Sequence, residues 1–199
     1  MKSAVKNILC LTIITLVAGF GLGYVYDITK EPIIRMEEKQ RLDAFKTVFP
    51  EAADFSDDMD ISNAPQIVAA SGTEGVDINS CVQALDASNS VIGYVINSTS
   101  HNGYGGDITV SVGIDNAGVV KGIEMLSISE TAGLGMKAKE PKFRDQFKDK
   151  AVKQFTYTKT GAASDFEIDA ISGATITTKA VTDAVNAALS YFGSLGGNQ

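Results

Sequence analysis

The sequence has 199 residues, of which 44% are hydrophobic and 21% charged, so a folded chain with a core of ordinary size is expected. The formal net charge is −7 and no stretch is dense in Lys or Arg. Nucleic acid is therefore excluded as a partner, because phosphate binding needs a concentrated basic face. Two cysteines and one histidine, His101, argue against a disulfide framework, a metal site and a Ser-His-Asp triad.

The first element is an uncharged segment, residues 7–26, which reads NILCLTIITLVAGFGLGYVY. As a helix, the apolar run from Ile8 would span about 29 Å, close to the ~30 Å hydrocarbon core of a bilayer. Lys2 and Lys6 precede it, which favours a cytoplasmic N-terminus. A cleaved signal peptide is the alternative, but the run is longer than a usual h-region and no A-x-A site follows. We expect residues 1–26 to be a single-pass membrane anchor, with the rest extracytoplasmic.

Two segments follow the anchor. Residues 29–48 mix charged residues with spaced apolar ones, which predicts a helix leaving the membrane with Pro32 in its first turn. Residues 51–77 are rich in Asp, Ser, Ala and Gly and are expected to form a loop or short irregular elements. We assign residues 27–80 to a juxtamembrane helix and a connecting segment.

From residue 81 onward the hydrophobic pattern changes to a period of two, with turn signals between the runs. Antiparallel strands are expected at residues 81–85, 91–96, 107–114 and 119–128. A short helix is expected over residues 141–150, with Phe143 and Phe147 on one face. Cys81 is expected to be a small apolar filler.

The last element is an amphipathic helix whose apolar residues recur at helical spacing: Val181, Val185, Ala188, Leu189 and Phe192. Thr177 or Thr178 can cap its start, and Gly193 closes it. Residues 81–199 therefore form one domain, and the part after the anchor is α+β, an antiparallel sheet with packed helices.

The segment before that helix reads DAISGATIT over residues 169–177. Gly173 and Ala174 leave room for a bulky phosphoryl group near the hydroxyl of Thr175, and free amides at a helix N-terminus favour an anion. A Ser/Thr-rich helix cap without a ligand explains the same spacing. Asp169 would be misplaced beside an anion, so we expect it to be a capping residue or a recognition feature for a modifying enzyme.

The pattern Asp-x-x-Ser-Gly-Ala-Thr at residues 169–175 resembles the flavinylation sequence of the FMN-binding domain family found in Rnf and Na+-translocating NADH:quinone oxidoreductase complexes. The resemblance implies that a separate flavin transferase, using FAD, joins FMN to Thr175 through a phosphoester. It also implies that Ser172, Gly173 and Ala174 adjoin the cofactor, and that Thr177 and Thr178 are out of register. Thr175 would then be an anchor and not a catalytic residue.

Two more stretches resemble the same family. Residues 103–108, GYGGDI, are similar to the segment that opens a core strand, and residues 130–135, ETAGLG, to the loop beside the flavin. Ala132 replaces the family's proline, which predicts a less rigid loop. Each stretch alone is explained by plain turn chemistry, but glycine-dense loops also let a planar ring approach the backbone.

The resemblance implies cofactor contacts from these two loops, namely from Tyr104, Glu130, Thr131, Gly133 and Leu134. Two of these roles stay open at this point. Glu130 could hydrogen-bond the flavin or cap a turn, and Tyr104 could stack on the ring or be a buried strand-end tyrosine. His101 is expected to be a surface loop residue.

Functionally, the resemblance implies an electron-transfer subunit of a membrane-bound, ion-translocating ferredoxin:NAD+ oxidoreductase, with covalent FMN as an extracytoplasmic relay. The length of 199 residues is closer to the G subunits of Rnf complexes than to the longer C subunits of the NADH:quinone complexes. Expected partners are the flavin transferase and other membrane subunits that carry flavins and iron–sulfur centres, since no Cys cluster is present. The alternatives are a subunit of an NADH:quinone oxidoreductase, or an unflavinylated membrane-anchored assembly or binding module.

Overall fold

The computed structural model describes residues 2–196 and divides into two compact units, Met1–Arg41 and Leu42–Gln199. The first unit is helical, because helix α1 covers Lys2–Val48. Its apolar part is long enough to cross a membrane, with a mean hydropathy of 2.2 and none of that window buried inside the protein. Pro32 lies inside this continuous helix and not in the first turn of a separate one. A proline inside a helix removes one hydrogen bond and strains the preceding turn, yet the exposed helix continues past Pro32.

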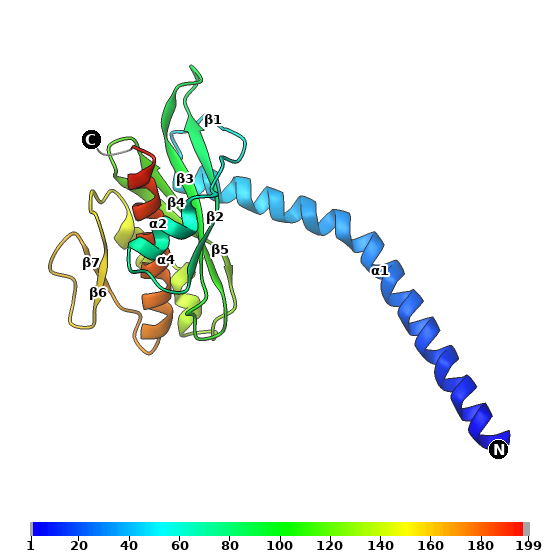
Figure 1. Cartoon of the computed structure of the whole chain (residues 1–199). Helices are drawn as coiled ribbons and strands as arrows, with labels where there is room; N and C mark the ends of the chain where they lie inside the picture. The colour runs from blue at the N-terminus through cyan, green and yellow to red at the C-terminus, as the bar shows by residue number, and fades with distance from the viewer. Residues whose placement is uncertain (1, 197–199) are drawn as a thin grey trace. The chain divides into compact units, whose positions relative to one another are not determined.

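The second unit is built on a five-stranded antiparallel sheet with the strand order β1-β2-β3-β4-β5 (Figure 1). The strands are β1 Asp54–Phe55, β2 Val76–Leu85, β3 Val91–Ser100, β4 Ile108–Asp115 and β5 Val120–Ile128. Each of the four expected strands is confirmed as part of β2 to β5. Strands β2 and β3 extend beyond the expected ends, because the polar residues 97–100 of β3 are buried and paired along its full length.

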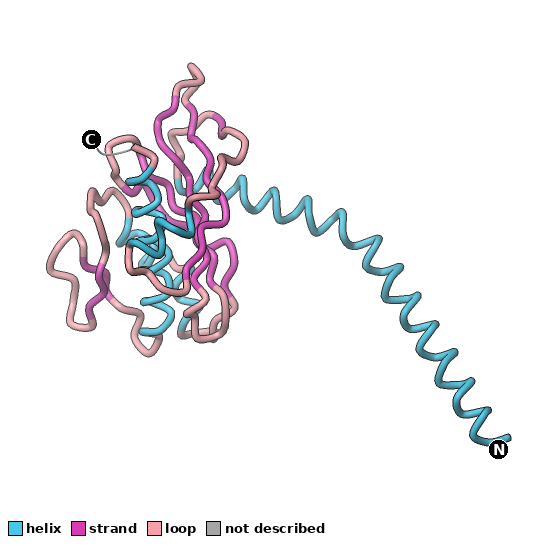
Figure 2. The backbone as a smooth tube through the Cα atoms, in the orientation of Figure 1, coloured by secondary structure: helices cyan, strands magenta, loops and turns pink. Residues whose placement is uncertain are grey.

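The remaining elements follow or flank the sheet (Figure 2). They are α2 Ala64–Ala70, η1 Gly135–Lys139, α3 Pro141–Arg144, η2 Asp145–Phe147, β6 Thr156–Thr158, β7 Glu167–Asp169 and α4 Thr175–Ser194. Strands β6 and β7 form a separate parallel pair. The expected helix at residues 141–150 is shorter and changes to 3-10 geometry after Arg144. The centroids of the Phe143 and Phe147 rings nevertheless lie 5.6 Å apart, on one face as the pattern predicted.

The main core lies between the sheet and α4, which runs along one face of the strands (Figure 1). The apolar residues predicted for the buried face of this helix, including Val181 and Val185, are buried. The Ser98 hydroxyl donates to the Ala184 carbonyl oxygen at 2.8 Å and joins β3 to the helix. Cys81 is fully buried in this core, as expected of an apolar filler.

The other face of the sheet is partly covered by the end of α1. Phe45 and Val48 pack with Val82 and Val95 in a second apolar cluster. A Cβ at Gly113 would lie 2.5 Å from the Val48 carbonyl oxygen, so this strand position needs glycine. The predicted division of the chain at residues 26 and 80 stays a prediction.

The start of α4 differs from the expectation. The helix begins at Thr175, its N-cap residue is Ala174, and no side chain caps it. Thr178 is buried inside the helix, where its hydroxyl accepts from the Ile171 N–H and donates to the Ala174 carbonyl oxygen, both at 3.0 Å. The prediction of a Thr177 or Thr178 cap is therefore wrong, because Thr178 fixes the approach segment from within the first turn and Thr177 is buried. The helix also ends at Ser194, one residue beyond Gly193.

Candidate functional site

Three segments meet at one end of the sheet: residues 103–106, 129–135 and 171–175. The first joins β3 to β4, the second follows β5, and the third leads into α4. Since the strands are antiparallel, the end of β3, the start of β4 and the end of β5 lie at the same end of the sheet. The three motifs found in the sequence are thus brought together by the topology.

Glu130 joins the first segment to the second. Its Oε1 accepts a hydrogen bond from the Tyr104 N–H at 2.8 Å, and the residue is only 8% exposed. A Cβ at Gly105 would lie 2.2 Å from the Ser129 carbonyl oxygen, so the two backbones meet where only glycine fits. Glu130 thus holds the backbone of the first segment, and its contact with the flavin stays a prediction.

Gly135 joins the second segment to α4. A Cβ at this position would lie 2.7 Å from both the Glu130 Cβ and the Thr177 Oγ1, and 2.8 Å from the Glu130 Oε2. No real Cβ makes contacts this short with several atoms at once. The Glu130 side chain, Gly135 and the first turn of α4 therefore pack without room for one methyl group.

The loop between them places Leu134 beside residues 171–175. The Thr131 carbonyl oxygen accepts from the Leu134 and Met136 N–H groups, both at 3.2 Å, and Gly133 turns the chain with a φ of +77°. Leu134 is 43% exposed, and its Cδ2 would lie 3.2 Å from a Cβ at Gly173. Leu134 is therefore a neighbour of the segment that carries Thr175, whereas Thr131 and Gly133 are exposed.

Thr175 is the first residue of α4 and is half-buried. The first helical hydrogen bond runs from the Thr178 N–H to the Ala174 carbonyl oxygen at 3.0 Å. Within the described residues, the N–H groups of Thr175, Ile176 and Thr177 donate to no protein atom, and the Thr175 hydroxyl has no hydrogen-bond partner. Such a helix end, with three free amides and the positive end of the dipole, favours an anion.

Exposure distinguishes the hydroxyls of this turn. Thr177 is 1% and Thr178 is 0% exposed, so neither can accept a large group without unfolding the turn. Ser172 and Gly173 are exposed, whereas Ala174 is buried. Among the three threonines of this turn, only Thr175 can therefore be reached from solvent.

A cleft of about 540 Å³ adjoins residues 171–175, with Ile171 and Ser172 in its lining. Lys137, Lys142 and Lys159 also line it, and within the described residues none of them forms an ion pair. Glu140 and Asp169 contribute the carboxylates of the cleft. Unpaired lysines are thus concentrated beside the motif of a chain whose overall net charge is −7.

Asp169 caps a turn. Its Oδ1 accepts a hydrogen bond from the Ala162 N–H at 2.5 Å, and its own N–H donates to the Gln146 Oε1 at 2.6 Å. The capping role expected for this residue is therefore seen in the loop between β6 and β7. Through these contacts Asp169 holds the loop that follows Lys159 against the cleft.

Large side chains of the three segments are exposed. Tyr104 is 72%, Ile176 is 53% and Leu134 is 43% exposed, and Leu134 and Ile176 adjoin the segment that carries Thr175. The alternative of a buried Tyr104 is therefore wrong. The sequence pattern did not single out Ile176, although its spacing from Val181 and Val185 removes it from the buried face of α4 and was the available signal.

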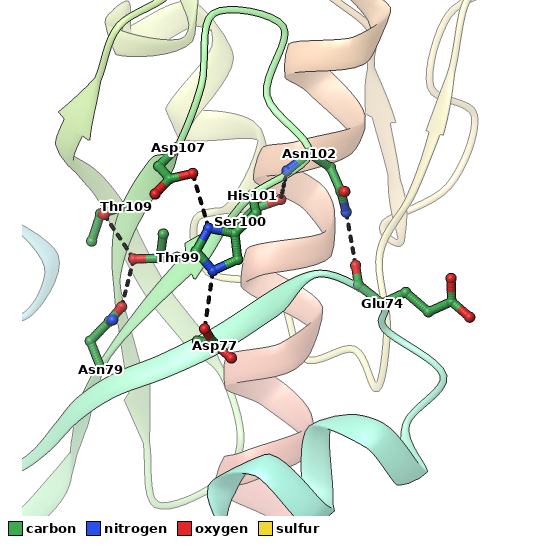
Figure 3. A network of polar contacts seen from close by, with 9 residues as sticks. All are labelled: Glu74, Asp77, Asn79, Thr99, Ser100, His101, Asn102, Asp107 and Thr109. Carbon is green, nitrogen blue, oxygen red and sulfur yellow. Dashed lines mark hydrogen bonds and ion pairs between the residues drawn. The ribbon is translucent and has the colours of Figure 1, made fainter.

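Other residues of the site were also missed. Gly105 and Gly135 belong to the recognised motifs, but their close contacts involve backbone and side chains distant in the sequence. The cleft lysines are spread over residues 137–159, where no local pattern connects them. His101, expected as an unremarkable surface residue, is exposed but lies between two carboxylates (Figure 3).

The family relationship agrees with this geometry. Residues 103–190, which include all three motifs, match the family model of the FMN-binding domain. The G subunit of the ion-translocating oxidoreductase complex of Methanosarcina acetivorans is 31% identical over 96% of this chain and 95% of that protein. The G subunit of the Na(+)-translocating ferredoxin:NAD(+) oxidoreductase complex of Acetobacterium woodii is 32% identical over 98% and 94%, respectively.

A solved structure supports the fold. The crystal structure of Shewanella oneidensis NqrC aligns with a TM-score of 0.50 and 20% identity, over 59% of this chain and 60% of that chain. This likeness concerns the fold alone and confirms the expected α+β architecture. The near full-length relatives show that the chain belongs to the family of G subunits of ion-translocating (Rnf-type) oxidoreductase complexes.

Proposed function

We propose that this chain is the extracytoplasmic electron-transfer subunit of a membrane-bound, ion-translocating ferredoxin:NAD+ oxidoreductase, and that it carries FMN on the Thr175 hydroxyl through a phosphoester. The observation that carries the proposal is the environment of Thr175. It is the accessible hydroxyl of the first turn of α4, with three free amide groups beside it. The family model of the FMN-binding domain gives the identity of the cofactor.

The residues present fit a phosphoryl group at this position. Gly173, with a φ of +77°, adds no side chain next to the hydroxyl. The amides of the first turn of α4 would hold the phosphoester oxygens, and the helix dipole would stabilise their negative charge. Lys137, Lys142 and Lys159 in the adjoining cleft would contribute a favourable field.

The exposed apolar residues suit the ring system. Tyr104, Leu134 and Ile176 would bury part of their surface against a bound isoalloxazine, which accounts for their exposure in a water-soluble domain. When bound, FMN supplies the one- or two-electron chemistry. The chain's own residues attach it, orient it and shield it, and we assign none of them a catalytic role.

The proposed topology follows from α1. Lys2 and Lys6 before the apolar run favour an N-terminus in the cytoplasm, which leaves the domain after α1 outside. A covalent tether suits that side of the membrane, since a flavin lost there could not be replaced from the cytoplasmic pool.

Electrons would have to pass to centres on other chains. The two cysteines are free; Cys10 lies in the apolar part of α1, and Cys81 is fully buried. Burial raises the pKa of the Cys81 thiol to about 12, so it is not a thiolate ligand at neutral pH. We therefore propose partner subunits with flavins and iron–sulfur centres, and a flavin transferase for maturation.

The test is in-gel flavin fluorescence of the denatured full chain after co-expression with a flavin transferase. We expect a fluorescent band for the native sequence and for Thr175→Ser, which keeps a hydroxyl, but none for Thr175→Ala. A fluorescent Thr175→Ala band would show that another residue is the acceptor. A native band without fluorescence would overturn the proposed electron relay and favour the unflavinylated module. The subunits that copurify with the chain distinguish a ferredoxin:NAD+ complex from an NADH:quinone complex.

A further inference from the structure

The ring of His101 is held between carboxylates from two different elements (Figure 3). Its Nε2 lies 3.0 Å from the Asp77 Oδ2 and its Nδ1 lies 2.9 Å from the Asp107 Oδ1. Asp77 belongs to β2, whereas His101 directly follows β3 and Asp107 directly precedes β4. Neutral imidazole carries one N–H, and only the imidazolium form can donate from both nitrogens, so the two contacts together require the second ring proton.

The charged surroundings of the ring favour that proton. Hydrogen bonds to Asp77 and then to Asp107 raise the pKa of His101 above its ordinary value, and slight burial opposes them. In the described part of the chain, these two carboxylates are the charged groups that act on the ring.

The contact with Asp107 closes the base of the loop that carries Tyr104. Residues 102–106 contain three glycines, so the loop loses much backbone entropy when it is ordered. Three other hydrogen bonds hold it: the Asn102 side-chain amide donates to the Glu74 carbonyl oxygen at 2.8 Å, the Asn102 N–H donates to the Ser100 hydroxyl at 3.4 Å, and the Tyr104 N–H donates to Glu130. None of these contacts depends on the protonation of His101.

We propose that His101 is a positioning residue of the flavin site. Its doubly protonated ring links the base of the 102–106 loop to β2 and thereby fixes the position of Tyr104. When the ring is neutral, one of its nitrogens presents a lone pair to a carboxylate oxygen, and the base of the loop is released on that side. The link from the loop to the flavin rests on the proposed function, but the clamp itself belongs to the chain alone.

The effect is modest, because the cluster is in contact with water. The His101 side chain is 46% exposed, and those of Asp77 and Asp107 are 68% and 64% exposed. Exposed ion pairs of this kind shift an equilibrium by about twofold to fivefold. A change of that size is measurable in the exchange of one backbone amide.

The first experiment measures the proton. The chain contains a single histidine, so the full-length chain in detergent micelles gives one imidazole signal by NMR. We expect this signal to titrate above the ordinary value of about 6.5, and at a lower pH in Asp77→Asn and Asp107→Asn. Asp165→Asn, which removes an exposed carboxylate in the loop between β6 and β7, is the control and leaves the titration unchanged.

The second experiment measures the loop in the same flavin-free chain. Hydrogen exchange of the Tyr104 amide is compared with that of the Gly118 amide, which donates to the Asp115 carbonyl oxygen in the β4–β5 turn. The quantity compared is the exchange rate of the Tyr104 amide divided by that of the Gly118 amide. Below the His101 pKa, this ratio is expected to be twofold to fivefold higher in His101→Gln than in the native chain. Above that pKa, the native ratio is expected to rise to that of the variant.

Titration of His101 at or below 6.5, or equal Tyr104 exchange in both chains at low pH, would overturn the clamp. Neither result would bear on flavin attachment, which the in-gel fluorescence decides separately. In the loaded chain, the visible circular dichroism of the flavin should follow the titration of His101 in the native protein and lose that dependence in His101→Gln. A flavin signal that does not respond would overturn the link between the clamp and the site.

Discussion

The Glu130 carboxylate accepts a hydrogen bond from the Tyr104 N–H at 2.8 Å, and the same side chain lies beside Gly135. Gly135 in turn lies beside Thr177 in the first turn of α4, so Glu130 joins two segments of the site directly and adjoins α4 through Gly135. Since Thr175, the proposed attachment point, lies at the start of that helix, we expect the geometry of the site to depend on Glu130.

Replacing Glu130 by Ala should destabilise the domain. The Tyr104 N–H would lose its hydrogen bond to the buried carboxylate, which would lower the unfolding free energy by about 1–3 kcal/mol. Glu130→Gln keeps an acceptor oxygen and should cost less. Thermal unfolding of the full chain in detergent measures both, with the exposed Glu140→Ala as the control. Equal melting temperatures for Glu130→Ala and Glu140→Ala would contradict this role.

Gly135→Ala should be destabilising for a steric reason. The new methyl group would lie 2.7 Å from the Thr177 Oγ1 and the Glu130 Cβ, so the first turn of α4 must move, at a cost of about 1–3 kcal/mol. Gly193→Ala is the matched control, because that helical position has no atom within 4 Å and should gain up to about 1 kcal/mol. A neutral Gly135→Ala in chemical denaturation would show that the segments are loosely packed.

Stability should fall with rising pH through the titration of His101. The folded-state pKa is raised by Asp77 and Asp107, so the contribution is fully present below the unfolded value of about 6.5 and is lost as pH rises through the folded-state pKa. The native melting temperature should therefore decline over that window more than the melting temperature of His101→Gln. Parallel curves for the two proteins would refute the linkage.

Reversing the charge of the cleft lysines should slow attachment of the flavin. Lys137→Glu and Lys159→Glu place a carboxylate beside the segment where we propose that the phosphoryl group is attached. We expect about a threefold to tenfold lower initial rate at low salt, with a smaller effect at high salt. The exposed Lys148→Glu, outside the cleft, is the control. An equal rate for all the variants would show that the cleft plays no part in attachment.

Much of the fold could be predicted because its strands and last helix have clear periods. The end of β3 could not, since Asn97 and Ser100 read as loop residues but are buried by strand pairing. The start of α4 was placed too late because Thr177 and Thr178 have the chemistry of caps. Their burial depends on Ile171 and Gly135, whose contacts with this turn are set by the tertiary fold.

The three motifs of the candidate site could be recognised in the sequence, but the contacts between them could not be predicted. Nothing in the sequence pairs Tyr104 with Glu130, which are 26 residues apart, or His101 with Asp77, which are 24 apart. Such contacts arise from the antiparallel register of β2, β3, β4 and β5. Local residues predicted only a phosphate-friendly hydroxyl before the last helix, because the features of a helix N-terminus are themselves local. The choice of Thr175 as the attachment point came from the family resemblance and stays a prediction.

The most direct measurement of the central claim is tandem mass spectrometry of the tryptic peptide of residues 160–179 from the full chain, matured together with a flavin transferase. This peptide holds Thr175 together with Ser172, Thr177 and Thr178. We predict a mass increase of one FMN less one water, with fragment ions that place it on Thr175. An unmodified peptide, or a flavin located on any of the other hydroxyls, would contradict the account.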